Sequence, residues 1–431
     1  MKSDLPKVLH KVANREMLNL VIDEAKTLNP KNITIVVSEE MKNFEAKIIA
    51  AHPQTKISFT LQKERKGTAH AVQTGLENLE IGEKLLILYG DTPLTSRVTL
   101  QKMVEKLSDF SLCILGFEED AENAYGRLVV DSEGHLEKIV EFKDATEEEK
   151  RISLCNSGVV AVEGKQIKKL LAQVKNENAP QEFYLTDIVG IAGEMGLKRT
   201  FLKTSIEEVF GVNSRFELAK VEKIKQNQIR RKMLDGGVTM PDPESVYFSF
   251  DTKIANDVVI HPQVFFGPKV VIEKNVEIKS FCHIEGAEIL SGAVVGPFAR
   301  LRPEAKIGEN VRVGNFVEVK KSHLKRGAKV NHLSYIGDCE IGEDSNIGAG
   351  TITCNYDGYN KFKTKIGKNV FVGSNSALVA PIEIADGAVI GAGSVITKNV
   401  AADELAVARG KQVVIADGGK KFHQDKSVGK K

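Results

Sequence analysis

Apolar residues recur every six positions through the second half of the chain. The recurring positions are Ile260, Phe266, Ile272, Ile278, Ile284 and Leu290, then Leu301, Ile307, Val313 and Val319, then Ile341 and Ile347, and then Ile366, Val372, Leu378, Ile384, Ile390 and Ile396. A six-residue period over such a length fits neither an amphipathic helix nor a simple strand, but it is typical of the hexapeptide repeat of a parallel β-helix. We therefore predict a β-helix over residues 246–409.

The six-residue period fails at two places. The first break lies between Val319 and Ile341, and the second lies between Ile347 and Ile366. A regular coil gives no reason for a long interruption. We therefore expect functional residues in both breaks.

The first half of the chain alternates short β-branched runs with helical stretches. The runs are residues 32–38, 56–62, 84–91 and 110–117. This rhythm predicts an α/β domain with a largely parallel sheet over residues 1–212. Ligands of such sheets bind beyond the carboxyl ends of the strands, which is where Gly90 and Asp91 follow a buried run.

Two further segments have their own character. Residues 214–234 contain no glycine or proline and predict one long helix within a linker over residues 213–245. Residues 410–431 are rich in lysine and predict a flexible basic tail without regular structure.

Composition narrows the class of protein. A chain of 431 residues is too long for one hydrophobic core, so we expect two or three folded units. Its 60 basic and 58 acidic residues nearly balance, so there is no large positive charge that would favour binding to nucleic acid. The five cysteines are scattered without a CxxC pair, which predicts neither a disulfide framework nor a zinc site and fits a reducing cytoplasm. The apolar runs are too short for membrane insertion, and the start has no signal-peptide pattern, so we expect a soluble cytoplasmic protein.

Several long segments carry a family resemblance. In the second half they are RLRPEAKIGENVRVGNFVEVKK, NHLSYIGD and NIGAGTITCNYDGYNKFKT; in the first half they include LPKVLH, QKERKGTAHAV, LYGDTPL, AYGRLV, CNSGV, EFYLTDI and EEVFGVNSR. Over about residues 3 to 409 the chain resembles the bifunctional N-acetylglucosamine-1-phosphate uridylyltransferase / glucosamine-1-phosphate acetyltransferase family.

The resemblance implies a fold and two reactions. The fold is a nucleotidyltransferase-like, Rossmann-like α/β domain, incomplete at its N-terminus, followed by a left-handed parallel β-helix that assembles as a homotrimer. The first reaction moves an acetyl group from acetyl-CoA to glucosamine-1-phosphate. The second joins the product to UTP and gives pyrophosphate and UDP-N-acetylglucosamine. UDP-N-acetylglucosamine then feeds bacterial peptidoglycan and lipopolysaccharide synthesis.

Acetyl transfer to an amine needs a positioned acceptor for the amine proton. Histidine, with an unperturbed pKa of about 6.5, suits this role near neutral pH, and the resemblance assigns it to His332. The resemblance implies that the sugar phosphate is bound by Arg302, Lys320, Tyr335, Asn346 and Lys361. It implies that acetyl-CoA is contacted by Ala349, Asn355, Tyr356, Ser374, Ala392 and Arg409. Asn355 or a backbone N–H could stabilise the oxyanion.

Uridylyl transfer depends on positioning and on neutralising phosphate charge. Mg²⁺ prefers hard oxygen ligands, and the resemblance places it on Asp91 and Asn213, which only the fold could bring together. Lys7 is implied to touch phosphate. The remaining contacts that the resemblance implies fall into three groups. Gln62, Gly67 and Thr68 surround the uracil of UTP, and Tyr89 and Gly90 flank the metal ligand. The amino sugar is bound by Gly126, Glu141 and Asn156.

The chain departs from the family at its start. The family opens with a strand and a glycine-rich loop of the type LAAGxGTRM, and this chain begins at what would be the last methionine of that loop. Either the start codon is placed too late, which the intact downstream residues favour, or the chain is truncated. As it stands, we expect the chain to transfer acetyl groups and to show weak or no uridylyl transfer.

Two other functions compete with the bifunctional enzyme. One is a non-catalytic scaffold or regulatory subunit, which the presence of Lys7, Asp91, Asn213 and His332 disfavours. The other is an acetyltransferase with a degenerate front domain. The DNA upstream of the start would distinguish it from the bifunctional enzyme.

Overall fold

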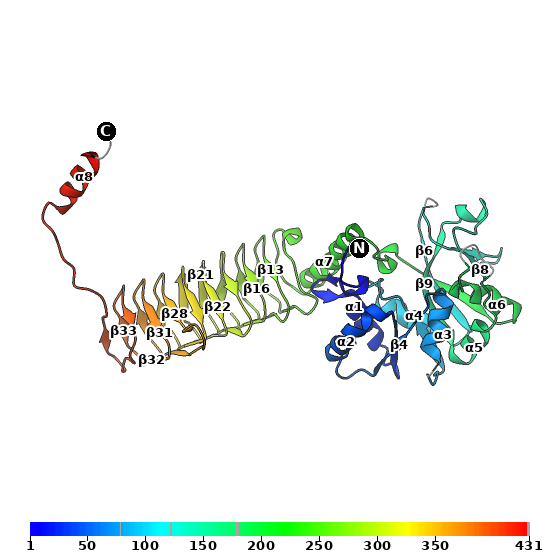
Figure 1. Ribbon diagram of the computed structural model, residues 1–431, viewed down its shortest axis with the longest axis horizontal. Coiled ribbons are helices and arrows are strands. Elements are labelled where there is room, and N and C mark those ends of the chain that lie inside the picture. Colours follow the sequence, from blue (N-terminus) through cyan, green and yellow to red (C-terminus); the bar gives the residue numbers. More distant parts are fainter. Residues whose placement is uncertain (78, 121–122, 177–180, 429–431) are drawn as a thin grey trace. The chain divides into compact units, whose positions relative to one another are not determined.

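The computed structural model describes residues 1–77, 79–120, 123–176 and 181–428. The chain divides into two compact units, Met1–Gln228 and Ile229–Lys431. The division falls within helix α7 (Arg215–Asp235), where the sequence predicts one long helix. Figure 1 shows both units coloured along the chain.

The first unit is built from short helices and strands. Its strands are β1 (Lys11–Val12), β2 (Arg15–Glu16), β3 (Ile33–Val37), β4 (Ile57–Leu61), β5 (Lys84–Ile87), β6 (Leu112–Glu118), β7 (Arg127–Val130), β8 (Leu136–Val140), β9 (Leu154–Glu163) and β10 (Arg199–Thr204). Its α-helices before α7 are α1 (Met17–Lys26), α2 (Glu45–Ala51), α3 (Thr68–Leu76), α4 (Arg97–Lys106), α5 (Gly164–Leu171) and α6 (Ile188–Glu194). Its 3-10 helices are η1 (Lys7–Leu9), η2 (Glu39–Phe44), η3 (Glu149–Arg151), η4 (Leu185–Asp187) and η5 (Ile206–Val209).

The main sheet of this unit is mixed. The four predicted runs are confirmed as β3, β4, β5 and β6, but the prediction of a largely parallel sheet is wrong. Strand β9 lies between β5 and β6 and runs antiparallel to both, while β10 runs parallel to β6. A buried apolar run carries no sign of its direction, so the sequence pattern could not distinguish the two arrangements.

Helices cover both faces of this sheet. Along β6, Leu112 and Ile114 belong to the core cluster that contains residues of α5 and α6, whereas Cys113 and Leu115 belong to the cluster that contains residues of α4. Successive side chains of a strand point to opposite faces, so a strand that is apolar throughout needs cover on both sides. This unit is therefore a layered α/β domain, as the sequence predicts.

The second unit is a left-handed β-helix of three parallel sheets. Sheet 1 contains β11 (Lys253–Ile254), β14 (Val271–Ile272), β17 (Ala287–Ile289), β20 (Ala305–Ile307), β23 (His323–Leu324), β26 (Cys339–Ile341), β29 (Thr364–Ile366) and β32 (Ile382–Ile384). Sheet 2 contains β12 (Val259–Ile260), β15 (Glu277–Ile278), β18 (Val294–Val295), β21 (Arg312–Asn315), β24 (Lys329–His332), β27 (Asn346–Ile347), β30 (Phe371–Val372), β33 (Val389–Ile390) and β35 (Leu405–Ala406). Sheet 3 contains β13 (Phe265–Phe266), β16 (His283–Ile284), β19 (Arg300–Leu301), β22 (Glu318–Lys320), β25 (Tyr335–Gly337), β28 (Ile352–Cys354), β31 (Ala377–Val379) and β34 (Val395–Ile396).

Two short elements flank the coils. A 3-10 helix, η6 (Pro243–Ser245), precedes them, and helix α8 (Gly418–Val428) lies in the tail, where the sequence predicts no regular structure. No helix in the described part of the chain is long and apolar enough to cross a membrane.

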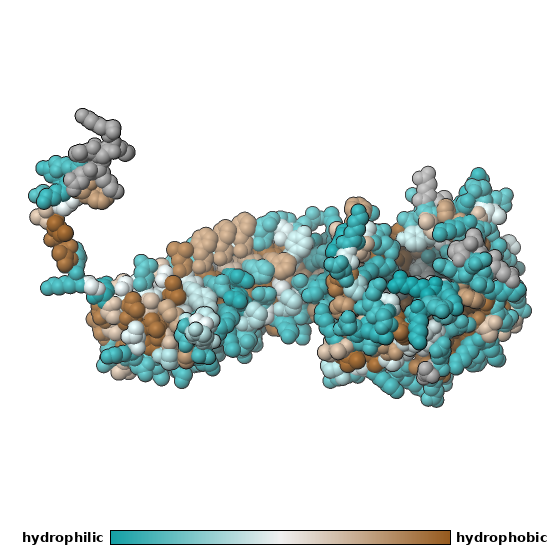
Figure 2. Space-filling view, viewed as in Figure 1, coloured by the Kyte–Doolittle hydropathy of each residue, from teal (hydrophilic) through white to brown (hydrophobic). Residues whose placement is uncertain are grey.

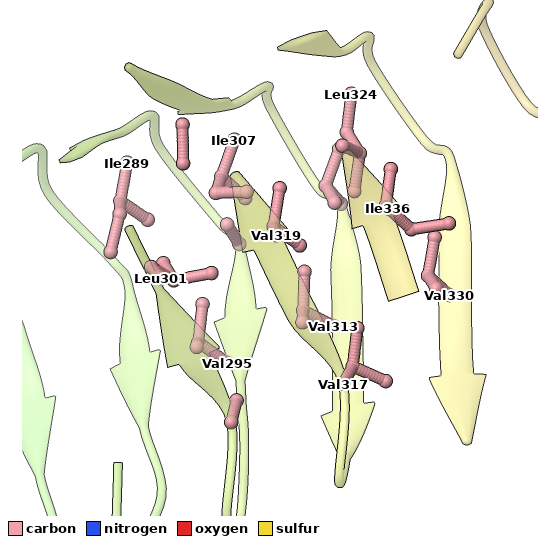
Figure 3. Packing of buried hydrophobic residues seen from close by; sticks show 14 of the residues in the cluster. Ile289, Val295, Leu301, Ile307, Val313, Val317, Val319, Leu324, Val330 and Ile336 are labelled. Carbon is pink, nitrogen blue, oxygen red and sulfur yellow. The ribbon is translucent and has the colours of Figure 1, made fainter. Parts of the chain in front are cut away.

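The inward residues of the coils form one continuous core, shown in part in Figure 3. Two details of the predicted repeat are wrong. Leu290 is only half-buried, and its neighbour Ile289 points inward instead. The first break is not an interruption, because Leu324, Val330 and Ile336 continue the buried row through it. Steps of five residues, to Leu324 and to Ile341 in sheet 1, replace the usual six there, so each coil still places a large apolar side chain in the core.

The second break is a real insertion. Residues 355–363 stand between β28 and β29 and leave the coil. The inward position just before them is Thr353, whose Oγ1 accepts a hydrogen bond from the Gly337 amide at 2.8 Å. The hydroxyl therefore ties the coil together where the repeat opens to admit a loop.

Candidate active sites

Three residues from distant parts of the first unit meet at one point. The Lys7 ammonium, in η1, donates to Asp91 Oδ2 at 2.6 Å and to Asn213 Oδ1 at 2.8 Å. The Val212 amide also donates to the Asp91 carbonyl at 3.0 Å, which fixes the chain before Asn213 against the loop after β5. The fold thus brings together the predicted phosphate contact and both predicted metal ligands.

A capping box holds Asn213 in place. Ser214 Oγ accepts from the Glu217 amide at 3.1 Å, and Glu217 Oε2 accepts from the Asn213 and Ser214 amides at 2.7 Å each. The sequence Ser-Arg-Phe-Glu at the start of α7 has the spacing of this motif. The side chain of Asn213 is therefore presented by a rigid helix start.

The donor set suits a hard divalent cation. The carboxylate of Asp91 and the side-chain amide oxygen of Asn213 both point at the Lys7 ammonium. Mg²⁺ prefers oxygen ligands of this kind. Among the described residues, no group of three or more His, Cys, Asp or Glu side chains could hold a metal ion. The protein would supply two oxygens here, leaving other positions to water and substrate phosphate.

A small cavity lies beside β9. Tyr89 and Asn156, both predicted site residues, line it together with Gly158 and Thr186. Gly158 has φ of +87°, and a Cβ there would lie 2.7 Å from the Tyr89 ring, so only glycine allows the ring to sit in this place. Asn156 Oδ1 accepts from the Gly158 amide at 3.0 Å, which fixes the orientation of the amide side chain.

The other predicted sugar contacts lie around this cavity. The Gly126 carbonyl oxygen accepts a hydrogen bond from the backbone N–H of Asn156 at 2.8 Å. A Cβ on Gly126 would lie 3.4 Å from Glu141 Oε2. Glu141 Oε1 accepts from the Thr186 hydroxyl at 3.0 Å. Thr186 and Gly158 are thus site residues that sequence reasoning missed, although the EFYLTDI and CNSGV segments contain them.

Burial and negative charge perturb the groups of this cavity. Burial, with the charges of Glu141 and Asp91, raises the pKa of Tyr89 to about 12. Burial also raises the pKa of Glu141, against the opposing effect of its hydrogen bond from Thr186. Burial and the charges of Glu141 and Asp144 raise the pKa of Asp187 to about 6. Glu141 and Asp187, near the cavity, therefore hold their protons more tightly than the same groups do in water.

The residues predicted around uracil lie between β4 and α3. Gln62 Nε2 lies 3.4 Å from the Gly67 carbonyl oxygen and 3.1 Å from His70 Nδ1. Gly67 has φ of +112°, and a Cβ there would lie 2.4 Å from the Phe183 carbonyl oxygen. Thr68 Oγ1 accepts from the Leu185 amide at 2.9 Å. The structure thus brings these three residues together and joins them to the segment that carries Thr186.

In the second unit, His332 lies at the end of β24 with its ring exposed. Its Nδ1 lies 2.8 Å from Asn315 Oδ1 on the preceding coil. Three predicted phosphate contacts, Arg302, Lys320 and Tyr335, belong to sheet 3 or follow it directly, and Arg302 donates to Glu318 Oε1 at 2.8 Å. Glu318 is therefore a further polar member of this face that sequence reasoning missed.

A second cation joins Lys320. The proximity of Lys320 lowers the pKa of Lys361, which the inserted loop carries. Two ammonium groups held against each other favour a bound anion between them. Asn346 lies apart from these groups on sheet 2, where its strand pairs with Lys329 and Phe371.

The predicted acetyl-CoA contacts form a line with His332. The Gly350 amide donates to the His332 carbonyl at 3.2 Å, the Asn375 amide to that of Ala349 at 2.7 Å, and the Gly393 amide to that of Ser374 at 2.8 Å. The Arg409 guanidinium donates to the Ala392 carbonyl at 2.6 Å. We call His332, Ala349, Ser374, Ala392 and Arg409 the corner column. With coils spaced by about 4.8 Å, the column spans about 19 Å.

Asn355 and Tyr356 begin the inserted loop instead of joining the column. Asn355 is buried, and its Nδ2 donates to Asp338 Oδ2 at 2.5 Å. Tyr356 is exposed and pairs with Lys361 across the loop in an antiparallel bridge. Asn355 therefore anchors the loop, and one of its two amide hydrogens is already used.

Comparison with known proteins covers both units. Residues 1–154 match the family model of the MobA-like NTP transferase domain, and residues 363–398 match that of the hexapeptide repeat of succinyl-transferase. The solved structure of HddC from Yersinia pseudotuberculosis aligns with 52% of this chain and 92% of its own at 18% identity, and its TM-score of 0.39 is too low to bear on the fold.

Curated relatives match along the whole chain. The bifunctional protein GlmU of Paramagnetospirillum magneticum is 46% identical over 100% of this chain and 95% of its own length. That of Zymomonas mobilis is 46% identical over 99% and 95%, and that of a Ruegeria species is 47% identical over 96% and 91%. Identity at this level over both units shows that the chain belongs to the GlmU family of bifunctional transferases, which transfer an acetyl group and a uridylyl group.

Proposed function

We propose that acetyl transfer to glucosamine-1-phosphate takes place beside His332. The Nε2 lone pair of His332 accepts a proton from the sugar amine as its nitrogen attacks the thioester carbonyl of acetyl-CoA. The new C–N bond forms, the C–S bond breaks, and the proton passes to the departing thiolate. The observation that carries this proposal is the corner column, which aligns the imidazole with four predicted acetyl-CoA contacts.

Phosphate binding supports the same placement. Arg302, Lys320 and Lys361 provide fixed positive charge for the sugar phosphate, with Tyr335 and Asn346 as polar contacts. Arginine offers a planar fork and lysine a point charge, and both are suited to phosphate. For the oxyanion, a backbone N–H is the better donor, because Asn355 already donates to Asp338.

We propose that Asp91 and Asn213 hold Mg²⁺ for uridylyl transfer. When bound, Mg²⁺ neutralises charge on the triphosphate of UTP. Lys7 then turns from the carboxylate to a phosphate oxygen, which keeps its ammonium paired. Gln62, Gly67 and Thr68 hold the uracil, Tyr89 and Gly90 flank the metal ligand, and Gly126, Glu141 and Asn156 position the acetylated sugar. A phosphate oxygen of that sugar attacks the α-phosphorus of UTP and pyrophosphate leaves.

We propose a homotrimer in which neighbouring copies cover the corner beside His332. Phe281, Phe298 and Phe316 stack there with ring centroids 4.7 and 5.2 Å apart, yet each is about half exposed. We call these three residues the phenylalanine ladder. Figure 2 shows a row of apolar side chains along one edge of the β-helix. All three have positive φ, a conformation that costs a bulky residue about 1–2 kcal/mol. Burial against a second copy would offset that cost.

We propose that the protein is located in the cytoplasm. All five cysteines are free thiols, as in a reducing compartment, and acetyl-CoA and UTP would be the co-substrates. The product would enter envelope precursor synthesis.

Paired assays of one protein test the two sites separately. Thiol release from acetyl-CoA reports acetyl transfer, and pyrophosphate release with UTP, Mg²⁺ and N-acetylglucosamine-1-phosphate reports uridylyl transfer. His332→Ala is expected to remove acetyl transfer and to keep uridylyl transfer at the level of the unaltered chain, however weak that level is, while Asp91→Ala is expected to remove uridylyl transfer and keep acetyl transfer. Acetyl transfer that survives His332→Ala would refute the assignment of the base.

A further inference from the structure

Asn315 and His332 occupy equivalent places on neighbouring coils. Asn315 ends β21, His332 ends β24, and the two residues are paired in the parallel register of sheet 2. Each precedes a corner residue with positive φ, Phe316 and Leu333. The Leu333 amide donates to the Asn315 carbonyl at 3.0 Å, so the backbones on both sides of the pair are fixed.

A glycine allows the two strands to approach closely at this point. A Cβ on Gly314 would lie 1.9 Å from the Asn331 carbonyl oxygen, so only glycine permits this approach of the backbones. The residues that follow, Asn315 and His332, are thereby held with Oδ1 and Nδ1 at 2.8 Å. This separation is within the range of a good hydrogen bond.

We propose that Asn315 is a positioning residue that sets the tautomer of His332. The proposal rests on the proposed role of His332 as the base. A neutral imidazole carries one N–H, and the acceptor Oδ1 keeps that hydrogen on Nδ1. The lone pair is then on Nε2, the nitrogen that faces away from Asn315 and can take the amine proton. Without this acceptor the ring can rotate, and part of the population carries the hydrogen on Nε2. In that tautomer Nε2 has no free lone pair and cannot accept the amine proton.

The amide is better suited to this task than a carboxylate. A carboxylate at Asn315 would also hold the hydrogen on Nδ1, but its charge would favour the imidazolium. A protonated ring cannot accept the amine proton. A neutral acceptor thus orients the ring without adding a negative charge that favours the imidazolium.

Two substitutions separate orientation from charge. Asn315→Leu removes the acceptor at similar volume, and kcat for acetyl transfer is expected to fall about 10- to 100-fold, within the range that a general base contributes, with the KM values little changed. Asn315→Asp keeps the acceptor and adds charge. Its activity at high pH is expected to approach that of the wild type, while the acidic limb of its pH–rate profile moves up by about one pH unit. Asn256→Leu, on an exposed turn, is the matched control and is expected to leave kcat unchanged.

Imidazole ¹⁵N shifts of the full-length protein give a readout that a merely structural role would not move. The wild-type signal of His332, identified by its loss in His332→Ala, is expected to show Nδ1 protonated and Nε2 free, and Asn315→Leu is expected to show a mixture. A kcat for Asn315→Leu equal to that of Asn256→Leu, or an unshifted profile for Asn315→Asp, would overturn the inference. If His332→Ala were active, the proposed base itself would be wrong, so the two failures are distinguishable.

Discussion

Lys7 Nζ lies 2.6 Å from Asp91 Oδ2, at the point where the carboxylate would meet a metal ion. The same ammonium lies 2.8 Å from Asn213 Oδ1. A lysine and a divalent cation cannot both occupy this place, because like charges at such a distance repel strongly. Lys7 therefore keeps the two oxygens together in the free protein, and under the proposed function it must leave when metal and nucleotide bind.

Replacing Lys7 is expected to have opposite effects on metal binding and on catalysis. In Lys7→Met, Mn²⁺ used as a probe for Mg²⁺ should bind the nucleotide-free protein more tightly, because no ammonium competes for Asp91. Uridylyl transfer should fall about 10- to 100-fold, since a charged hydrogen bond contributes about 1.5–3 kcal/mol. Electron paramagnetic resonance titration measures the first effect and pyrophosphate release the second. Lys11→Met, at an exposed position in β1, is the control; weaker Mn²⁺ binding in Lys7→Met would contradict this account.

Asp187 makes the stability of the first unit depend on pH. Its pKa of about 6 is above the value of about 3.9 expected in an unfolded chain, so the folded state binds the proton more tightly. The stabilisation is complete below about pH 4 and is lost as pH rises through 6. Asp187→Asn should therefore stabilise the first unit at pH 8 by about 1 kcal/mol, a value reduced because the side chain is half-exposed, and by less at pH 5. Calorimetry at both pH values measures this, with the exposed Asp4→Asn as control; an equal gain at both would disprove it.

Gly337 makes room for Tyr335. A Cβ at Gly337 would lie 2.4 Å from the Tyr335 hydroxyl, and Gly337 pairs with Lys320 in the next strand. Gly337→Ala should push the tyrosine ring aside and raise the KM for glucosamine-1-phosphate about tenfold, equivalent to about 1.4 kcal/mol, while uridylyl transfer stays unchanged. Steady-state kinetics measure the change. Gly190→Ala, where an added Cβ meets no atom within 4 Å, is the matched control; an unaltered KM in Gly337→Ala would show that Tyr335 does not bind the sugar phosphate.

The fold of the second unit could be predicted because most strands place a large apolar side chain in the core at the same position of the repeat. The period of six follows from that geometry, and buried residues such as Ile307, Val313 and Val319 confirm it. The row through Leu324, Val330 and Ile336 was harder to recognise, because two steps of five shift the phase without leaving the coil. In the first unit, the apolar run of β9 predicts a strand but gives no sign that it runs antiparallel between β5 and β6.

The candidate sites depend on contacts that no local pattern contains. Asp91 and Asn213 are far apart in the sequence, and only the fold shows that both reach Lys7. Thr186 was missed because its role comes from a hydrogen bond to Glu141 on another element. Asn315 was missed because the coil that separates it from His332 contains the five-residue step into Leu324, so the two residues are 17 apart and a strict period of six does not align them.

Assembly through the phenylalanine ladder can be tested without harming the fold of a single chain. Asparagine adopts positive φ more readily than phenylalanine, so Phe298→Asn with Phe316→Asn relieves backbone strain while removing the exposed apolar surface. The double variant is expected to sediment as a monomer. Its acetyl transfer should fall at least tenfold, because the proposed site needs a neighbouring copy, whereas uridylyl transfer should persist. Lys269→Asn makes the same kind of replacement at a positive-φ residue outside the ladder and should leave the trimer intact. A double variant that sediments like the wild type would show that the ladder is not the interface, and since the substitutions favour the local backbone, unfolding could not account for a monomer.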